Sequence, residues 1–108
     1  MITRLSRRLL LGCAVPLVVG AAPASPRRHR VDIRDLEYRP PNLVIAVRDT
    51  VSWVNHDIVP HTVTFGDATG DRDEVKPGEW FTLVVSERQA LRYRCRYHPG
   101  MTGTVVAR

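Results

Sequence analysis

The stretch that decides the fold runs from residue 91 to residue 107 and reads LRYRCRYHPGMTGTVVA. Its first part alternates apolar or aromatic residues with arginines as far as Cys95 and Arg96. That two-residue period is typical of a β-strand with one buried face. Gly103 permits a bend, and Thr104–Ala107 can form a further strand. The stretch therefore predicts two strands joined by a loop.

The two-residue period also occurs upstream. It is present in residues 31–38, with one change of phase, and in residues 43–47, 51–53, 61–65 and 81–85. Prolines and turn residues separate these segments, and residues 66–79 form a loop. Because the first three segments follow one another with short turns, we expect them to pair antiparallel. About seven short strands without a helical apolar face predict an all-β fold, a small antiparallel β-sandwich.

Four residues of this sandwich could bind a metal. Cys95, His98 and Met101 follow one another at three-residue spacing, and His61 begins a different segment. Taken singly, each has an ordinary explanation, such as a polar residue at a strand start, a surface histidine or a core methionine. Together they offer a thiolate, two imidazoles and a thioether, which suit copper, whereas zinc has little use for a thioether. The sequence therefore predicts a copper site, provided that the sandwich brings His61 to the loop.

Several segments resemble those of the cupredoxins, the blue copper proteins of the plastocyanin and azurin superfamily. They are Trp53-Val54-Asn55, Pro60-His61-Thr62-Val63, Pro77-Gly78 and the residues from Cys95 to Gly103. The Cys-x2-His-x2-Met spacing is most similar to that of the amicyanins, and the resemblance covers Val31–Arg108. It implies a Greek-key β-sandwich and one type 1 copper per chain. It also implies electron transfer through His98, whose ring edge would reach the surface within an apolar patch.

Three further positions need explanation. The residue after the first histidine ligand is often asparagine in cupredoxins, where it pins the ligand loop, and here it is Thr62. Arg48 stands where a glycine is frequent in a Gly-Asp turn. Asn55 either supports the site by hydrogen bonding or is an ordinary turn asparagine.

The amino-terminal residues resemble an export signal. A basic segment, an apolar run and the motif Ala22-Pro23-Ala24 follow one another. The apolar run is shorter than the roughly 20 residues of a spanning helix. Ser6-Arg7-Arg8-Leu9-Leu10 resembles a twin-arginine signal, with an ordinary Sec signal as the alternative. We expect a signal peptide at 1–24, a basic flexible linker at 25–30 and the cupredoxin domain at 31–108.

Loss of the signal changes the charge and the cysteine content. The sixteen Lys and Arg residues fall to thirteen, against eleven acidic residues, so most of the basic excess disappears. The remaining basic residues do not interleave with exposed aromatic residues, which argues against nucleic-acid binding. Cys13 leaves with the signal, so Cys95 has no partner for an internal disulfide. Only His29 and His56 remain beside the ligands, too few for a further catalytic centre, and we expect no enzyme.

The sequence predicts a periplasmic carrier of single electrons. We expect a redox protein donor and acceptor that dock near His98, a monomeric mature chain and no stable insertion into a membrane. The alternative is a copper storage or delivery protein without a dedicated electron-transfer role. Arg92, Arg94 and Arg96 are expected to point outward, where they either steer an acidic partner or are simply solvated.

Overall fold

The structure is a computed structural model that describes residues 25–66 and 73–108. The expected signal peptide lies outside the described residues. Within the described residues there is no helix of the length and apolar character needed to cross a membrane. The described strands are β1 (Arg28–Arg34), β2 (Glu37–Arg39), β3 (Asn42–Ile45), β4 (Thr50–Asn55), β5 (His61–Thr62), β6 (Thr64–Phe65), β7 (Glu74–Val75), β8 (Trp80–Val84), β9 (Gln89–Arg94) and β10 (Thr102–Ala107).

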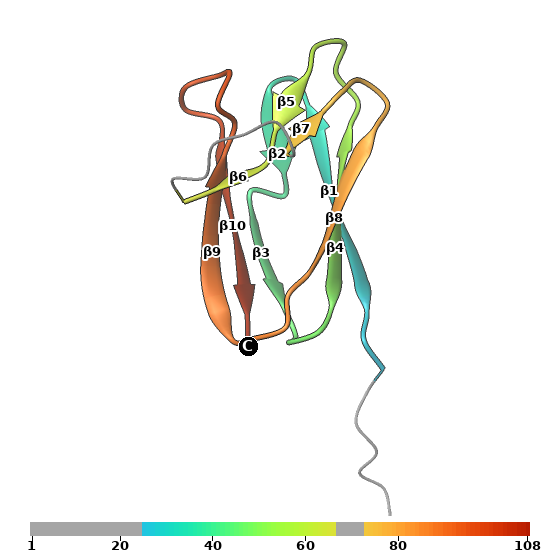
Figure 1. Ribbon diagram of the computed structural model, residues 1–108, viewed down its shortest axis with the longest axis vertical. Coiled ribbons are helices and arrows are strands. Elements are labelled where there is room, and N and C mark those ends of the chain that lie inside the picture. Colours follow the sequence, from blue (N-terminus) through green and yellow to red (C-terminus); the bar gives the residue numbers. More distant parts are fainter. Residues whose placement is uncertain (1–24, 67–72) are drawn as a thin grey trace, which may run out of the picture.

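The strands form two facing sheets, which confirms the predicted all-β sandwich (Figure 1). One sheet has the order β2-β1-β4-β8, and the other has the order β3-β10-β9-β6. The short pair β5-β7 lies at the end of the sandwich opposite the carboxyl terminus (Figure 1). The loop between β9 and β10 lies at that same end, so the fold brings the two predicted ligand segments together.

The pairing of the first strands differs from the expected succession. β1 pairs with β4 in parallel, and β3 lies in the other sheet, where it pairs with β10 in parallel. Pro40 and Pro41 follow β2, and because prolines cannot donate to a ladder, the chain leaves the first sheet there. Strand β1 also begins at Arg28, so residues expected in the linker already pair with β4.

The change of phase within residues 31–38 is a turn. Asp35 and Leu36 have φ angles of 55° and 61°, and they separate β1 from β2, which pair antiparallel. Both residues adopt the left-handed region that is unfavourable for residues with a Cβ atom. The alternation on each side of the turn therefore belongs to two strands, with Ile33 opposite Tyr38.

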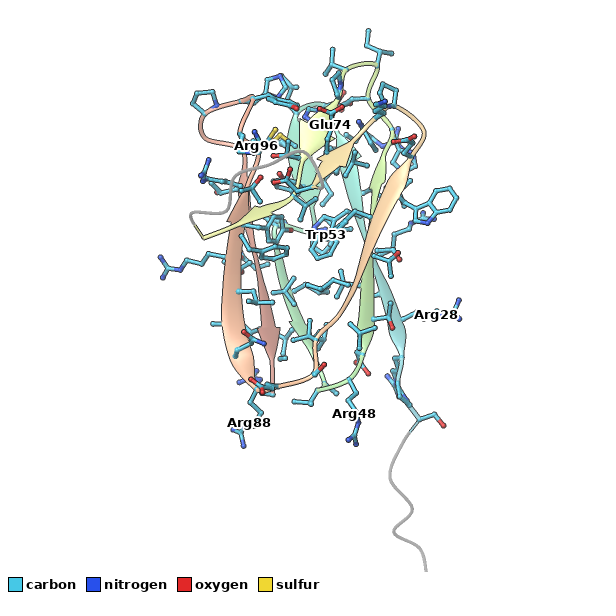
Figure 2. The ribbon with its side chains drawn as sticks, in the orientation of Figure 1. Arg28, Arg48, Trp53, Glu74, Arg88 and Arg96 are labelled. Atoms are coloured by element: carbon cyan, nitrogen blue, oxygen red, sulfur yellow. The ribbon has the colours of Figure 1, made fainter. Side chains whose placement is uncertain are left out.

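The core is centred on Trp53 of β4, which is fully buried (Figure 2). Its ring lies near those of Phe65, Phe81 and Tyr93, with centroid distances of 6.0, 5.7 and 5.3 Å. Tyr93 also packs against Gly103 of β10, where an added Cβ would lie 2.4 Å from the tyrosine ring. This close contact holds β9 against β10, the two strands from which the loop with Cys95 projects.

Candidate metal centre

The structure brings His61, Cys95 and His98 into one cluster, with their donor atoms within 4.8 Å of one another. Cys95 Sγ lies 3.8 Å from His61 Nδ1 and 3.5 Å from His98 Nδ1. His61 is the first residue of β5, and Cys95 follows the last residue of β9. The condition set by the sequence, that His61 should reach the loop after β9, is therefore met.

Met101 is buried at the end of the same loop. Its backbone N–H donates to the carbonyl of His98 at 3.2 Å, and its carbonyl accepts from the N–H of Cys95 at 3.0 Å. These two bonds close the segment from Cys95 to Met101 into a compact loop. Figure 2 shows the sulfur atoms gathered near Arg96 at this end of the sandwich.

The Cys95 sulfur also receives a hydrogen bond. The backbone N–H of Thr62 donates to Sγ at 3.4 Å. A donor aimed at the sulfur stabilises negative charge on it, as a thiolate ligand requires. Thr62, the residue next to His61, thus positions and polarises the sulfur of Cys95.

The Thr62 side chain pins the ligand loop, the role expected of the asparagine that is often present at this position in cupredoxins. Its Oγ1 accepts from the backbone N–H of Arg96 at 2.8 Å and shares a hydrogen bond of 2.9 Å with Thr64 Oγ1. Both threonines are fully buried. The hydroxyl pair therefore fixes the start of the loop to the residues that follow His61.

Asn55 supports the segment that leads to His61. Its Nδ2 donates to the carbonyls of Val59 and Val75, each at 2.9 Å, and its Oδ1 accepts from the backbone N–H of Asp57 at 2.8 Å. The hydrogen-bonding explanation for Asn55 is therefore confirmed. The side chain acts on the backbone before His61 rather than on a ligand.

The ligand loop is also braced from the side of β7. Arg96 Nη2 donates to Asp73 Oδ1 at 2.8 Å, and the hydroxyl of Tyr97 donates to Glu74. Burial alone would raise the pKa of Asp73, but hydrogen bonds from Arg96 and Thr64 outweigh it and lower the pKa below its usual value. The carboxylate is therefore ionised at neutral pH and pairs with Arg96.

The expected outward direction of the three arginines holds only in part. Arg92 and Arg94 are exposed, whereas Arg96 lies beyond β9 and turns to Asp73. Two-residue alternation predicts side-chain direction only while the strand continues, and β9 ends at Arg94. The prediction for Arg96 was wrong for that reason.

The contact between Asp57 and His61 was not predicted from the sequence. Its Oδ2 lies 2.8 Å from Nε2 of the fully buried His61. Burial raises the pKa of Asp57, but hydrogen bonds from the backbone of Leu36 and Asp35 and from His61 outweigh it and lower the pKa. Asp57 belongs to no alternating segment, and its place four residues before a histidine was the only available signal.

The second histidine lies nearer to solvent. His98 is partly buried, and its ring centroid lies 4.9 Å from that of His61. Exposed apolar and aromatic side chains flank the two histidines in sequence, namely Ile58, Val59 and Tyr97. The site therefore has a buried side at His61 and an accessible side at His98.

The donor set fits copper. Within the described residues the cluster contains one thiol and two imidazoles and no carboxylate, with the buried thioether of Met101 in the same loop. Soft sulfur ligands combined with imidazole nitrogens are the set that copper prefers, whereas magnesium and calcium require oxygen ligands.

Comparison with known proteins agrees with this chemistry. Residues 27–108 match the family described as copper binding proteins, plastocyanin/azurin family. Amicyanin from Paracoccus denitrificans is 36% identical over 81 residues, which cover 70% of this chain and 62% of the relative. The chain thus spans about six-tenths of the length of the amicyanins it matches.

Solved structures show the same relationship. A reduced amicyanin mutant matches with a TM-score of 0.68 and 34% identity, over 75% of this chain and 82% of the other. A purple cupredoxin from Nitrosopumilus maritimus matches with a TM-score of 0.66 and 28% identity, over 74% of this chain and 99% of the other. The chain therefore belongs to the plastocyanin/azurin family of copper-binding proteins, and its ligand group is that of a cupredoxin.

Proposed function

We propose that this protein is a periplasmic carrier of single electrons between redox proteins, exported by residues 1–24, and not an enzyme. The family assignment supports an electron-transfer carrier, and the loop spacing supports a type 1 site. Cys95 would be the thiolate ligand, His61 and His98 the equatorial imidazole ligands, and Met101 the axial ligand. When bound, one copper ion supplies the Cu(I)/Cu(II) couple.

The observation that carries the proposal is the construction of the site from two separate segments. His61 is held by β5, whereas the other three ligands lie on one loop between β9 and β10. Two hydrogen bonds of Thr62 join the two segments, because its backbone N–H donates to the Cys95 sulfur and its hydroxyl oxygen accepts from the backbone N–H of Arg96. A donor set fixed in this way changes little between two oxidation states, which favours rapid electron transfer over metal release.

The accessible side of the site supports docking near His98. Ile58 is 93% exposed, and Val59 and Tyr97 are also exposed at this end of the sandwich. An apolar surface of this kind supports brief contact with a partner without the need to desolvate charges. A donor and an acceptor would each approach the His98 ring, and the mature chain would act as a monomer.

Voltammetry of residues 25–108 loaded with copper tests the proposal. We expect a reversible one-electron couple in the parent protein. His98→Ala should abolish that couple or shift it strongly. The matched control is His56→Ala, which removes a surface histidine hydrogen-bonded to Asp32 at 2.7 Å and should leave the couple unchanged. Tight Cu(I) binding without a reversible couple would instead indicate a storage or delivery protein and would contradict the proposal.

A further inference from the structure

The two histidines of the cluster differ in what their outer nitrogens contact. His61 Nδ1 faces the Cys95 sulfur, and its Nε2 lies 2.8 Å from Asp57 Oδ2. His98 also turns Nδ1 to the sulfur, but no side chain or carbonyl in the described parts of the chain is hydrogen-bonded to its Nε2. One histidine is therefore held at both ring nitrogens, and the other is held at one.

The carboxylate of Asp57 is itself fixed by the backbone. Oδ1 accepts from the N–H of Asp35 at 2.7 Å, and Oδ2 accepts from the N–H of Leu36 at 3.0 Å. The N–H of Asp57 donates to Asn55 Oδ1, which anchors the residue from the other side. Because its side chain is only 13% exposed, the carboxylate has little freedom to turn away from His61.

The two backbone donors come from the turn with unusual conformation. Asp35 and Leu36 both have positive φ angles, which point successive N–H groups toward one acceptor. Such a conformation is unfavourable for residues with a Cβ atom, and the carboxylate offsets part of that cost. Leu36 also lines a surface hollow together with Met101. Asp57 thus connects His61 with the turn at Asp35 and Leu36, which lies beside Met101.

We infer that Asp57 is a positioning residue that fixes the ring and tautomer of His61 and supplies a negative charge next to the metal centre. This inference rests on the proposed function and extends it. The carboxylate accepts a hydrogen bond from the Nε2–H of His61, which keeps the proton on Nε2 and leaves the Nδ1 lone pair free for the metal. A fixed negative charge stabilises the more highly charged Cu(II) more than Cu(I), so Asp57 lowers the reduction potential of the site.

Asp57→Asn tests the charge, since the amide keeps one oxygen acceptor but carries no charge. Loss of such a partner typically weakens metal binding by about 10–100-fold. We expect a loss in this range for Cu(II) and a smaller loss for Cu(I), measured by competition with chelators. Each tenfold difference between the two losses raises the one-electron potential by about 59 mV.

Asp49→Asn is the matched control, because Asp49 also accepts from two backbone N–H groups and one histidine, at the opposite end of the sandwich. It should leave both copper affinities and their ratio unchanged. If folded Asp57→Asn kept the parental ratio of Cu(II) to Cu(I) affinity, the inference would be overturned.

Nitrogen-15 NMR of the metal-free parent protein decides the question if Asp57→Asn does not fold. We expect the His61 proton on Nε2, in slow exchange with solvent, and faster exchange at the more exposed His29. A proton on His61 Nδ1 would overturn the inference. Neither readout depends on electron transfer, so failure of the proposed carrier function would be distinguished from failure of this assignment.

Discussion

The two ends of the sandwich contain the same arrangement of a carboxylate and a histidine. At one end, Asp49 Oδ2 lies 2.8 Å from His29 Nε2, and Asp49 accepts from the backbone N–H groups of Arg27 and Ala46. At the other end, Asp57 binds His61 and two backbone N–H groups of a turn. Figure 2 shows the separation, with Arg48 at the first end and Glu74 and Arg96 at the second.

The ends differ in what lies beyond the histidine. The side chain of His29 is 23% exposed and lies in β1, so its bond to Asp49 ties the first strand to the turn before β4. His61 is fully buried, and its second nitrogen faces a thiol. A single hydrogen-bonding motif therefore closes the fold at one end and orients a metal ligand at the other. What surrounds each carboxylate–histidine pair, and not the hydrogen bonds within it, determines what the pair does.

Removal of the Cys95 thiol should have the largest effect, and that effect should be confined to the end of the sandwich that holds the metal centre. Cys95→Ser replaces the soft thiolate ligand, so we expect complete loss of the intense visible band of the Cu(II) protein. The metal-free variant should still fold, because the hydrogen bonds of Asp49 are untouched. Visible absorption and thermal unfolding measure the two effects, and a surviving band would refute the assignment of Cys95 as a ligand.

Loss of the Thr62 hydroxyl should weaken the ligand end without removing a ligand. Thr62→Val leaves the backbone N–H of Arg96 without the acceptor at 2.8 Å. An unsatisfied group of this kind costs about 1–3 kcal/mol. Ser52→Ala is the control, since it removes the exposed hydroxyl pair of Ser52 and Thr82 and should change stability by less than about 0.5 kcal/mol. Denaturant unfolding measures both variants, and an equal loss of unfolding free energy in Thr62→Val and Ser52→Ala would contradict the special position of Thr62.

At the end remote from the metal centre, acid should reduce the stability of the protein by protonating Asp49. Hydrogen bonds from the Arg27 backbone and from His29 lower the pKa of Asp49 from 3.8 to about 2. Its contribution to stability is therefore complete above pH 3.8 and is lost as the pH falls toward 2. Asp49→Asn should make the metal-free protein less sensitive to acid over this interval in unfolding experiments. An unchanged pH dependence would rule out this linkage.

The smallest effect is expected at the turn beside Asp49. Arg48 has a φ angle of 79°, which is unfavourable for a residue with a Cβ atom and which glycine would adopt without that cost. Arg48→Gly relieves a cost of about 1–2 kcal/mol but increases the entropy of the unfolded chain. We expect a net gain of at most about 1 kcal/mol and no change in the visible spectrum. A clear loss of stability would show that the Arg48 side chain contributes more than its backbone conformation costs.

The four residues of the candidate site could be identified from the sequence because their chemistry lies in the residue types themselves. Cys95, His98 and Met101 share one loop, and only the distance to His61 depended on the fold. The two sheets followed from alternation, which identifies buried faces. Alternation does not identify neighbouring strands, so the parallel pairings of β1 with β4 and of β3 with β10 were not foreseen.

Asp57, Asp73 and β7 could not be predicted for a related reason. Each acts through contacts between residues far apart in the chain, such as Asp57 with Leu36 and Asp73 with Arg96. Strand β7 contains two residues, which are too few to show a period, and it is recognised only by its pairing with β5. The residues that tune the site are therefore less visible in the sequence than the residues that form it.

The most direct test of the central claim is the visible and EPR spectrum of residues 25–108 after addition of one equivalent of Cu(II). If His61, Cys95, His98 and Met101 form one preorganised site, the protein will show an intense blue absorption and the narrow copper hyperfine splitting of a thiolate-bound ion. A pale protein with the wide splitting of copper bound by nitrogen and oxygen alone would contradict the claim.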